Sequence, residues 1–313
     1  MSGPVTTADA PPIADNGQVE TSCVEVTDSH EAVVGRFHVR RALPRRGRRT
    51  VGAWCFADHM GPADVTENSG LDVGPHPHMG LQTVTWLLDG EALHRDSLGS
   101  EQLIAPGQLN LMTAGGGVAH AEEATGSYSG RLHGIQLWVA QPEETRHGDA
   151  AFEHHAELPQ VDLGGGTATV LIGELGGGVS PARRDTELVG VDLALGSGTD
   201  AVLAVRRDFE HALVVLDGAV TIGATTLTPG HLGYLGRDRD ELPLRAEERS
   251  RVLLLGGVPF PEPILMFWNF VARDRTEMET AWRAWNDDTG RFGRVASSLS
   301  RIPSPDPYWL TTR

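Results

Sequence analysis

The feature that most constrains this chain is a series of short apolar runs, separated by turn residues, whose order occurs twice. In the first half, the run at 86–90 (WLLDG) is followed by a Pro-Gly turn at 105–108 (APGQ). In the second half, the run at 214–218 (VVLDG) is followed by a Pro-Gly turn at 228–231 (TPGH). Short strands between such turns are typical of β-sandwiches and barrels. The repeated order therefore predicts an all-β protein built from two copies of one barrel.

The chain has 313 residues, with 38 Gly and 19 Pro, which suits a fold rich in strands and turns. Residues 1–17 have no periodic pattern and are expected to form a disordered tail. We expect the first barrel over 18–160 and the second barrel over 161–313, together with a C-terminal helix at 274–285 that Asp274 would cap. The predicted strands, in chain order, are 35–41, 80–88, 109–112, 132–139, 191–195, 201–205, 212–216 and 219–222.

The net charge of −16 argues against a general affinity for nucleic acids or anionic membranes. One basic cluster, Arg40, Arg41, Arg45, Arg46, Arg48 and Arg49, is interpreted as a solvated hairpin tip rather than a nucleic-acid patch, because Pro44 and Gly47 interrupt it. No apolar run is long enough to cross a membrane, and the N-terminus lacks a signal-peptide pattern, so a cytoplasmic protein is expected. Cys23 and Cys55 lack the CxxC spacing and are expected to be reduced.

Two short motifs, His76-Pro77-His78 and His120-Ala121-Glu122, indicate a metal site. Residues spaced i, i+2 on a strand point to the same face of the sheet. Two such strands inside one barrel would bring together three imidazoles and one carboxylate. The remaining histidines occur singly and have hydrogen-bonded core or surface roles as their default interpretation.

Imidazole and carboxylate ligands suit divalent first-row metals, and four ligands leave two octahedral positions open. A catalytic or sensory metal is therefore favoured over a structural zinc, which would more often recruit thiolates. We expect one divalent transition metal. Fe(II) is preferred, while Ni, Mn, Co, Cu and Zn stay open because ligand type alone does not select among them.

Four segments carry a resemblance to a known family. They are 58–62 (DHMGP), 75–80 (PHPHMG), 113–122 (TAGGGVAHAE) and 132–139 (LHGIQLWV), and residues 258–264 (VPFPEPI) add a match in the second half. This pattern resembles the pirins of the cupin superfamily over nearly the whole chain after the tail. The resemblance implies a bicupin, in which two antiparallel jelly-roll barrels pack face to face and only the N-terminal barrel holds a metal.

The resemblance assigns the metal ligands to His76, His78, His120 and Glu122. The strand at 209–212 lacks an HxH pair, so His211, like His231, is expected to be structural. Many cupins carry Glu four residues after the second motif histidine, where this chain has Gln82. The four ligands are unaffected by this exchange. The surroundings of the ligands are affected, because a neutral amide cannot act as a base or as a negatively charged hydrogen-bond acceptor.

Some pirins are quercetin 2,3-dioxygenases, and the resemblance implies that activity, with a flavonol and O2 as substrates. Glu122 is the expected catalytic base for the flavonol hydroxyl. The expected substrate pocket comprises His59, Phe56, Met60, Met79 and Met112, for each of which ordinary packing is the alternative. The second functional hypothesis is a non-catalytic pirin that regulates transcription or a metabolic enzyme by binding a protein partner. A monomer is expected.

Overall fold

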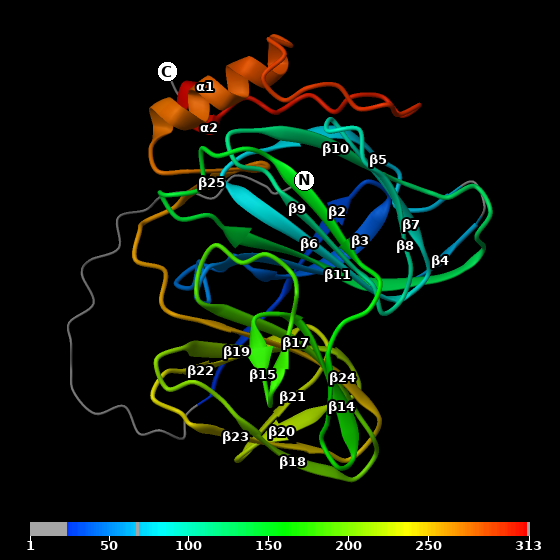
Figure 1. The fold of residues 1–313 in the computed structure, drawn as a ribbon, viewed down its shortest axis with the longest axis vertical. Helices are drawn as coiled ribbons and strands as arrows, with labels where there is room; N and C mark the ends of the chain where they lie inside the picture. The colour runs from blue at the N-terminus through cyan, green and yellow to red at the C-terminus, as the bar shows by residue number, and fades with distance from the viewer. Residues whose placement is uncertain (1–23, 67–68, 312–313) are drawn as a thin grey trace.

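The computed structural model describes residues 24–66 and 69–311 and consists of two β-barrels stacked on each other, with a helix on the outer side of the first (Figure 1). This arrangement confirms the predicted all-β bicupin. The predicted tail at 1–17 and Cys23 lie outside the described residues.

The first barrel is made of two antiparallel sheets of seven and four strands. The seven-stranded sheet runs, in sheet order, β12 (Ala151–His155), β9 (Leu109–Thr113), β6 (Leu81–Asp89), β11 (Gly130–Ala140), β4 (Trp54–Val65), β3 (Phe37–Leu43) and β2 (His30–Val34). The four-stranded sheet runs β5 (Val73–His78), β10 (Val118–Glu123), β7 (Ala92–Asp96) and β8 (Glu101–Ile104).

The second barrel repeats the first, sheet for sheet. Its seven-stranded sheet runs β1 (Glu25–Asp28), β22 (His231–Gly236), β19 (Glu210–Asp217), β24 (Ser250–Gly257), β17 (Leu188–Leu195), β14 (Gly166–Ile172) and β13 (Gln160–Asp162). Its four-stranded sheet runs β18 (Thr199–Ala204), β23 (Glu241–Ala246), β20 (Val220–Ile222) and β21 (Thr225–Leu227), and a small hairpin joins β15 (Glu174–Leu175) to β16 (Gly178–Val179). The matching strand orders explain why the turn pattern occurs twice in the sequence.

The two large sheets face each other, and one hydrophobic core fills the space between them. Because strand side chains alternate, Val84 and Trp86 of β6 enter this shared core, as do Val214 and Leu216 of β19. Trp54 extends across the interface, where its indole Nε1 donates to the carbonyl oxygens of Val189 (3.1 Å) and Gly256 (3.2 Å). The face-to-face packing is therefore a buried, specific contact between the barrels.

The two ends of the chain cross between the barrels, which corrects the predicted division into 18–160 and 161–313. Strand β1 pairs with β22 of the second barrel, although it precedes every strand of the first. After β24, the hairpin of β25 (Leu265–Phe267) and β26 (Phe270–Ala272) returns to the first barrel. There the amide of Val271 donates to the carbonyl oxygen of Met79 at 3.0 Å. Each barrel is thus completed by residues from the far end of the chain.

Helix α1 (Arg275–Asn286) confirms the predicted helix, and the Asp274 side chain accepts a hydrogen bond from the amide of Glu277 at its start. The apolar side of α1, including Met278 and Trp285, packs against Met79 and Phe270 on the outside of the first barrel. A last short helix is α2 (Tyr308–Thr311). Over the described residues, no helix is long and apolar enough to cross a membrane.

Candidate metal centre

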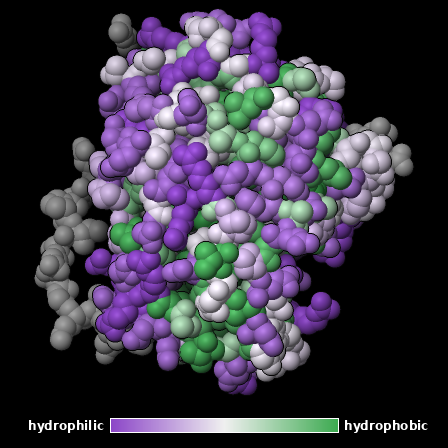
Figure 2. Space-filling model, in the orientation of Figure 1, coloured by the Kyte–Doolittle hydropathy of each residue, from purple (hydrophilic) through white to green (hydrophobic). Residues whose placement is uncertain are grey.

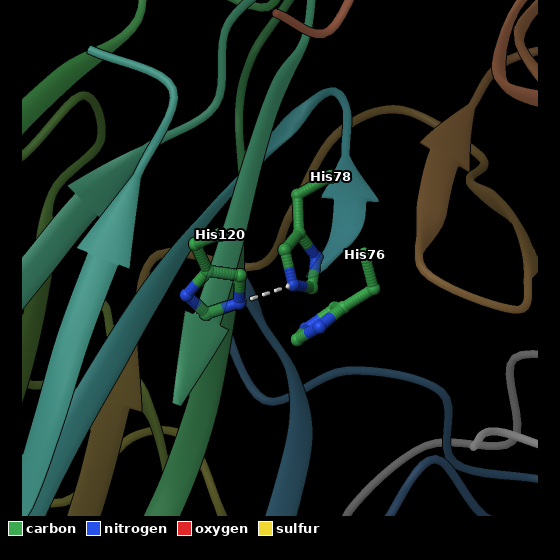
Figure 3. A group of neighbouring side chains, drawn as sticks. All are labelled: His76, His78 and His120. Atoms are coloured by element: carbon green, nitrogen blue, oxygen red, sulfur yellow. Dashed lines mark hydrogen bonds between the residues drawn. The ribbon is translucent and has the colours of Figure 1, made fainter. Parts of the chain in front are cut away.

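Three histidines converge inside the first barrel, as the two sequence motifs predict. His76 and His78 lie on β5, His120 lies on the neighbouring strand β10, and the antiparallel register places His120 opposite His76. Their ligand nitrogens all lie within 4.8 Å of one another (Figure 3). The geometry therefore brings three potential metal ligands to one point in the buried interior.

A hydrogen bond fixes which nitrogen of His76 faces this point. The Nδ1–H of His76 donates to the carbonyl oxygen of Gly74 (2.9 Å), which leaves the Nε2 lone pair free. The Nε2 atoms of His78 and His120 lie only 3.0 Å apart. Burial lowers the pKa of all three imidazoles, that of His76 to about 4, so each is neutral at pH 7. Neutral imidazoles whose ring nitrogens lie this close together are a favourable arrangement for a cation.

Glu122 faces the same cavity, two residues beyond His120 on β10. Its carboxyl lies outside the tight group formed by the three imidazoles, and a bulge in the β5 pairing separates it from His120. Burial raises the pKa of Glu122 to about 7, and a hydrogen bond from Thr85 opposes that rise. Its service as a fourth ligand therefore stays a prediction.

The donor set fits a divalent transition metal held by nitrogen and oxygen ligands. Cys55, the described cysteine, is fully buried, and burial raises the pKa of its thiol to about 12. Its sulfur donates to the Trp138 carbonyl oxygen at 3.6 Å, so it remains a thiol engaged elsewhere. Thiolate ligation, and with it a typical structural zinc site, is not supported by the described residues.

The cavity above the histidines has a volume of about 70 Å³. Of the predicted pocket residues, Phe56 and Met60 line it. Both lie on β4, where alternation points them, together with Asp58, toward the barrel interior. The cavity is also lined by Arg41, Asp58, Glu122, Trp138, Trp268, Asn269 and Ile302.

His59, Met79 and Met112 do not line the cavity, which corrects their predicted placement. His59 points to the opposite face of β4, and its Nε2 lies 2.8 Å from that of His133. Met79 is buried under α1, and Met112 packs with Val118 and Phe152. The prediction chose these residues by type and position in a motif, whereas strand alternation decides which side chains face the metal.

A buried ion pair in the cavity wall was missed by the sequence analysis. The Arg41 guanidinium donates to both carboxylate oxygens of Asp58, at 2.7 and 2.6 Å. Arg41 also lies over the Phe56 ring, 4.5 Å from its centroid, and Phe56 stacks on Trp138 with 4.0 Å between centroids. Arg41 is therefore part of the cavity wall and not of a solvated hairpin tip. The alternation of Phe56, Asp58 and Met60 was the signal that could have identified the pair.

The C-terminal segment covers the cavity. Trp268 and Asn269, between β25 and β26, line it together with Ile302. The amide of Ile302 donates to the Pro75 carbonyl oxygen at 2.9 Å, beside the histidine strand. Gly74 permits this approach, since a Cβ there would collide with the Ser300 carbonyl oxygen. No local pattern predicts that residues 268–302 complete a site made by residues 76–122.

Gln82, which replaces the usual cupin glutamate, does not line the cavity. Its amide nitrogen donates to Thr113 Oγ1 at 3.0 Å, and the side chain is fully buried. The carboxyl that faces the histidines is that of Glu122.

Comparison with known families agrees with this geometry. The Pirin family model matches residues 36–139, and the model of the Pirin C-terminal cupin domain matches residues 190–293. The chain belongs to the pirin family. The first match contains the three histidines and Glu122, and the second contains most strands of the second barrel.

Pirins similar to this chain include a Pseudomonas aeruginosa protein named "Putative quercetin 2,3-dioxygenase". It is 45% identical over 285 residues, which cover 91% of this chain and 90% of the relative. A pirin-like protein of Caulobacter vibrioides is 38% identical, with 83% and 92% covered. The crystal structure of a quercetin 2,3-dioxygenase from Acinetobacter baumannii has a TM-score of 0.88 at 41% identity, and the match covers 90% of this chain and 95% of that one.

Proposed function

We propose that this pirin is a metal-dependent 2,3-dioxygenase of flavonols such as quercetin. The observation that carries the proposal is the convergence of three neutral imidazoles and one carboxyl with a raised pKa on one cavity. Perturbed titratable groups in a cavity are typical of catalytic sites. The names of the similar proteins support the flavonol as the substrate class.

His76, His78 and His120 would hold the metal, with Glu122 as the fourth ligand. We infer Fe(II) as the resident ion, with Ni, Mn, Co, Cu and Zn as the alternatives that the experiment below compares. When bound, the metal would supply Lewis acidity that lowers the pKa of the flavonol hydroxyl.

Glu122 is the proposed catalytic base. A pKa of about 7 gives its carboxyl a proton affinity suited to exchange at neutral pH. The carboxyl lines the cavity, where it would accept the proton of the substrate hydroxyl. The stacked Phe56 and Trp138 rings would contact the planar substrate.

The cover of the cavity must open for a flavonol to enter. Sites for molecules of this size occupy roughly 300–1,000 Å³, whereas this cavity holds about 70 Å³. Trp268, Asn269 and Ile302 form the part contributed by the C-terminal segment. In the closed arrangement these side chains would exclude water from the reacting groups.

The small cavity also favours a second candidate function, a non-catalytic pirin that binds a protein partner in a metal-dependent manner. In that case the metal would remain enclosed, and its redox state would alter the surrounding surface. Both functions use the same ligands, so turnover distinguishes them.

The deciding experiment is aerobic incubation of quercetin with protein loaded separately with each of the six metals. A dioxygenase should bleach the flavonol absorption band and release carbon monoxide, and the His76→Ala, Glu122→Ala double variant should do neither. Stoichiometric metal binding without bleaching by any loaded form would contradict the enzymatic function and favour the second candidate.

A further inference from the structure

The second barrel has a cavity of its own, with a volume of about 300 Å³. It lies at the end that corresponds to the metal cavity of the first barrel. His78 stands 11 residues before Asp89, where β6 ends, and Arg206 stands 11 residues before Asp217, where β19 ends. By this count Ala204 and Arg206 take the places of His76 and His78, and both line the second cavity. The duplication has kept the cavity and replaced the metal-binding histidines.

A buried histidine without hydrogen bonds faces this cavity. Leu213 and Val215 of β19 point into the second barrel, so alternation points His211 the same way. His211 is only 1% exposed, and neither ring nitrogen has a hydrogen-bond partner. Gly256 lies against its ring, where a Cβ would come within 2.8 Å of Cδ2, so the backbone of β24 fixes the imidazole. Buried polar groups are normally paired, and a ligand can provide the missing partner.

The walls of the second cavity are largely apolar. Leu175, Leu188, Val189, Val205 and Phe209 line it. The Arg206 guanidinium lies over the Phe209 ring at 4.1 Å and is neutralised by hydrogen bonds to Asp208 and Glu187. Such walls suit the ring of an aromatic ligand.

A cationic group lies at the rim. Arg184 is exposed and forms an ion pair with Glu187. The guanidinium nitrogen and the carboxylate oxygen of this pair are 3.9 Å apart, beyond hydrogen-bond distance. The hairpin of β15 and β16, which lies at the front of the second barrel in Figure 1, forms another part of the rim. It contributes the exposed Glu174. Figure 2 shows hydrophilic side chains over much of this face and apolar ones gathered on its lower part, over the second barrel. The cavity thus has a guanidinium outside and an imidazole inside.

We propose that the second barrel binds a small phenolic carboxylate, with its carboxylate at Arg184, its ring against the apolar walls and its hydroxyl paired with His211. Burial lowers the pKa of His211 to about 4, so at neutral pH the ring offers one donor and one acceptor, which suits a hydroxyl. Glu174 would disfavour a second negative charge at the rim. The site is separate from the metal centre and does not depend on the proposed dioxygenase activity.

The test is calorimetric titration of the full chain with 4-hydroxybenzoate, benzoate and 4-hydroxybenzamide. We expect one equivalent of 4-hydroxybenzoate to bind, and each analogue to bind roughly tenfold more weakly, since each lacks one polar interaction. His211→Leu should remove the preference over benzoate, and Arg184→Gln the preference over the amide. Arg207→Gln, an exposed arginine paired with Asp240 outside the cavity, is the matched control and should leave the Kd unchanged.

Two further measurements separate this site from the metal centre and from misfolding. Binding should persist in the His78→Ala variant, and loss of binding there would place the ligand in the first barrel and overturn the proposal. The imidazole ¹⁵N resonances of His211 in the unmodified protein should shift on titration, which tests the contact without a variant. Absence of binding at millimolar concentration, or a Kd for 4-hydroxybenzoate in the His211→Leu and Arg184→Gln variants equal to that of the unmodified protein, would also overturn it.

Discussion

The Nδ1 atoms of His94 and His120 lie 3.4 Å apart, which links a metal-site imidazole to a carboxylate behind it. The Nε2 of His94 lies 3.1 Å from Asp96 Oδ2, and the other oxygen of Asp96 accepts the amides of Leu98 and Ser100. The carboxylate therefore holds the His94 proton on Nε2, so that the His94 Nδ1 accepts a hydrogen bond from the Nδ1–H of His120. His120 in turn presents the lone pair of its Nε2 to His78.

Substitution of Asp96 should weaken metal binding although Asp96 is linked to the metal-site histidines only through His94. In Asp96→Asn, the His94 tautomer is no longer fixed, and we expect metal affinity to fall by roughly 10–100-fold, as for other partners of metal-bound histidines. Competition with a chromophoric chelator measures the Kd. Glu101→Gln, on the adjacent strand and paired with Arg95 at the surface, is the control. Equal affinity in both variants would show that Asp96 does not position His120.

Removal of the metal should lower the stability of the protein. At a free metal concentration of 100 Kd, binding to the folded state alone stabilises it by about 2.7 kcal/mol, which corresponds to a fall in Tm of about 5 °C on chelation in a domain of this size. Differential scanning calorimetry with and without a chelator measures the shift. His78→Ala should show none, whereas His231→Ala, in the second barrel, should respond like the unmodified protein. A full response in His78→Ala would contradict the ligand assignment.

Removal of one partner of the Arg41–Asp58 ion pair should lower the stability of the protein strongly, whereas replacement of both partners by apolar residues should lower it little. Both side chains are almost fully buried, so Arg41→Met leaves an unpaired carboxylate and should destabilise the protein by about 3–5 kcal/mol. The double variant Arg41→Met, Asp58→Leu removes both charges and should recover most of that loss. Urea unfolding measures each free energy. A double variant as unstable as the single one would mean that the hydrogen bonds of the pair exceed its desolvation cost.

The parts of the site that follow from local strand geometry were predictable from the sequence. The i, i+2 spacing places His76 and His78 on one face of β5, and two inward motifs in one barrel suffice to bring in His120. The same alternation identifies Phe56 and Met60. It also places His59 on the face of β4 that points away from the cavity. The alternation of side chains along a strand therefore predicts the cavity lining better than membership of a sequence motif does.

The parts that depend on pairing between distant segments were not predictable. No pattern in the residues themselves indicates that β1 pairs with β22. The same is true of the return of Trp268 and Ile302 to the first barrel. Arg41 belongs to a basic cluster in the sequence, and only its tertiary contact with Asp58 places it in the wall of the cavity. Long-range contacts of this kind are specified by the summed packing of the fold and not by any one short segment.

Truncation of Ile302 should admit larger substrates to the metal cavity. Ile302→Ala shortens a side chain of the cover but keeps the backbone hydrogen bond to Pro75. If the cover limits access, the KM for quercetin should fall several-fold while metal content stays constant. Val295→Ala, a partly buried position packed against the cluster under α1 and outside the cavity, controls for general loosening of the segment. An unchanged KM with unchanged metal content would show that Ile302 does not restrict access.

The close contact of His59 with His133 should make the protein sensitive to acid independently of the metal. Their Nε2 atoms share one hydrogen bond at 2.8 Å, so one nitrogen must donate and the other accept. Burial, with help from Arg40 and His133, lowers the pKa of His59 to about 3, below its ordinary value of 6.5. Between these values the unfolded chain binds the proton and the folded one does not, so stability falls as the pH falls through this window.

His59→Gln removes the titrating group and keeps a side chain that can hydrogen-bond to His133. Each pH unit within the window corresponds to about 1.4 kcal/mol, so the loss of stability from pH 6.5 to pH 5 should be smaller in the variant by about 2 kcal/mol. Urea unfolding across this range, with chelator present throughout, measures the difference, and the exposed His38→Gln on β3 is the control. Parallel curves for the His59 variant and the unmodified protein would mean that the folded barrel accommodates the protonated pair.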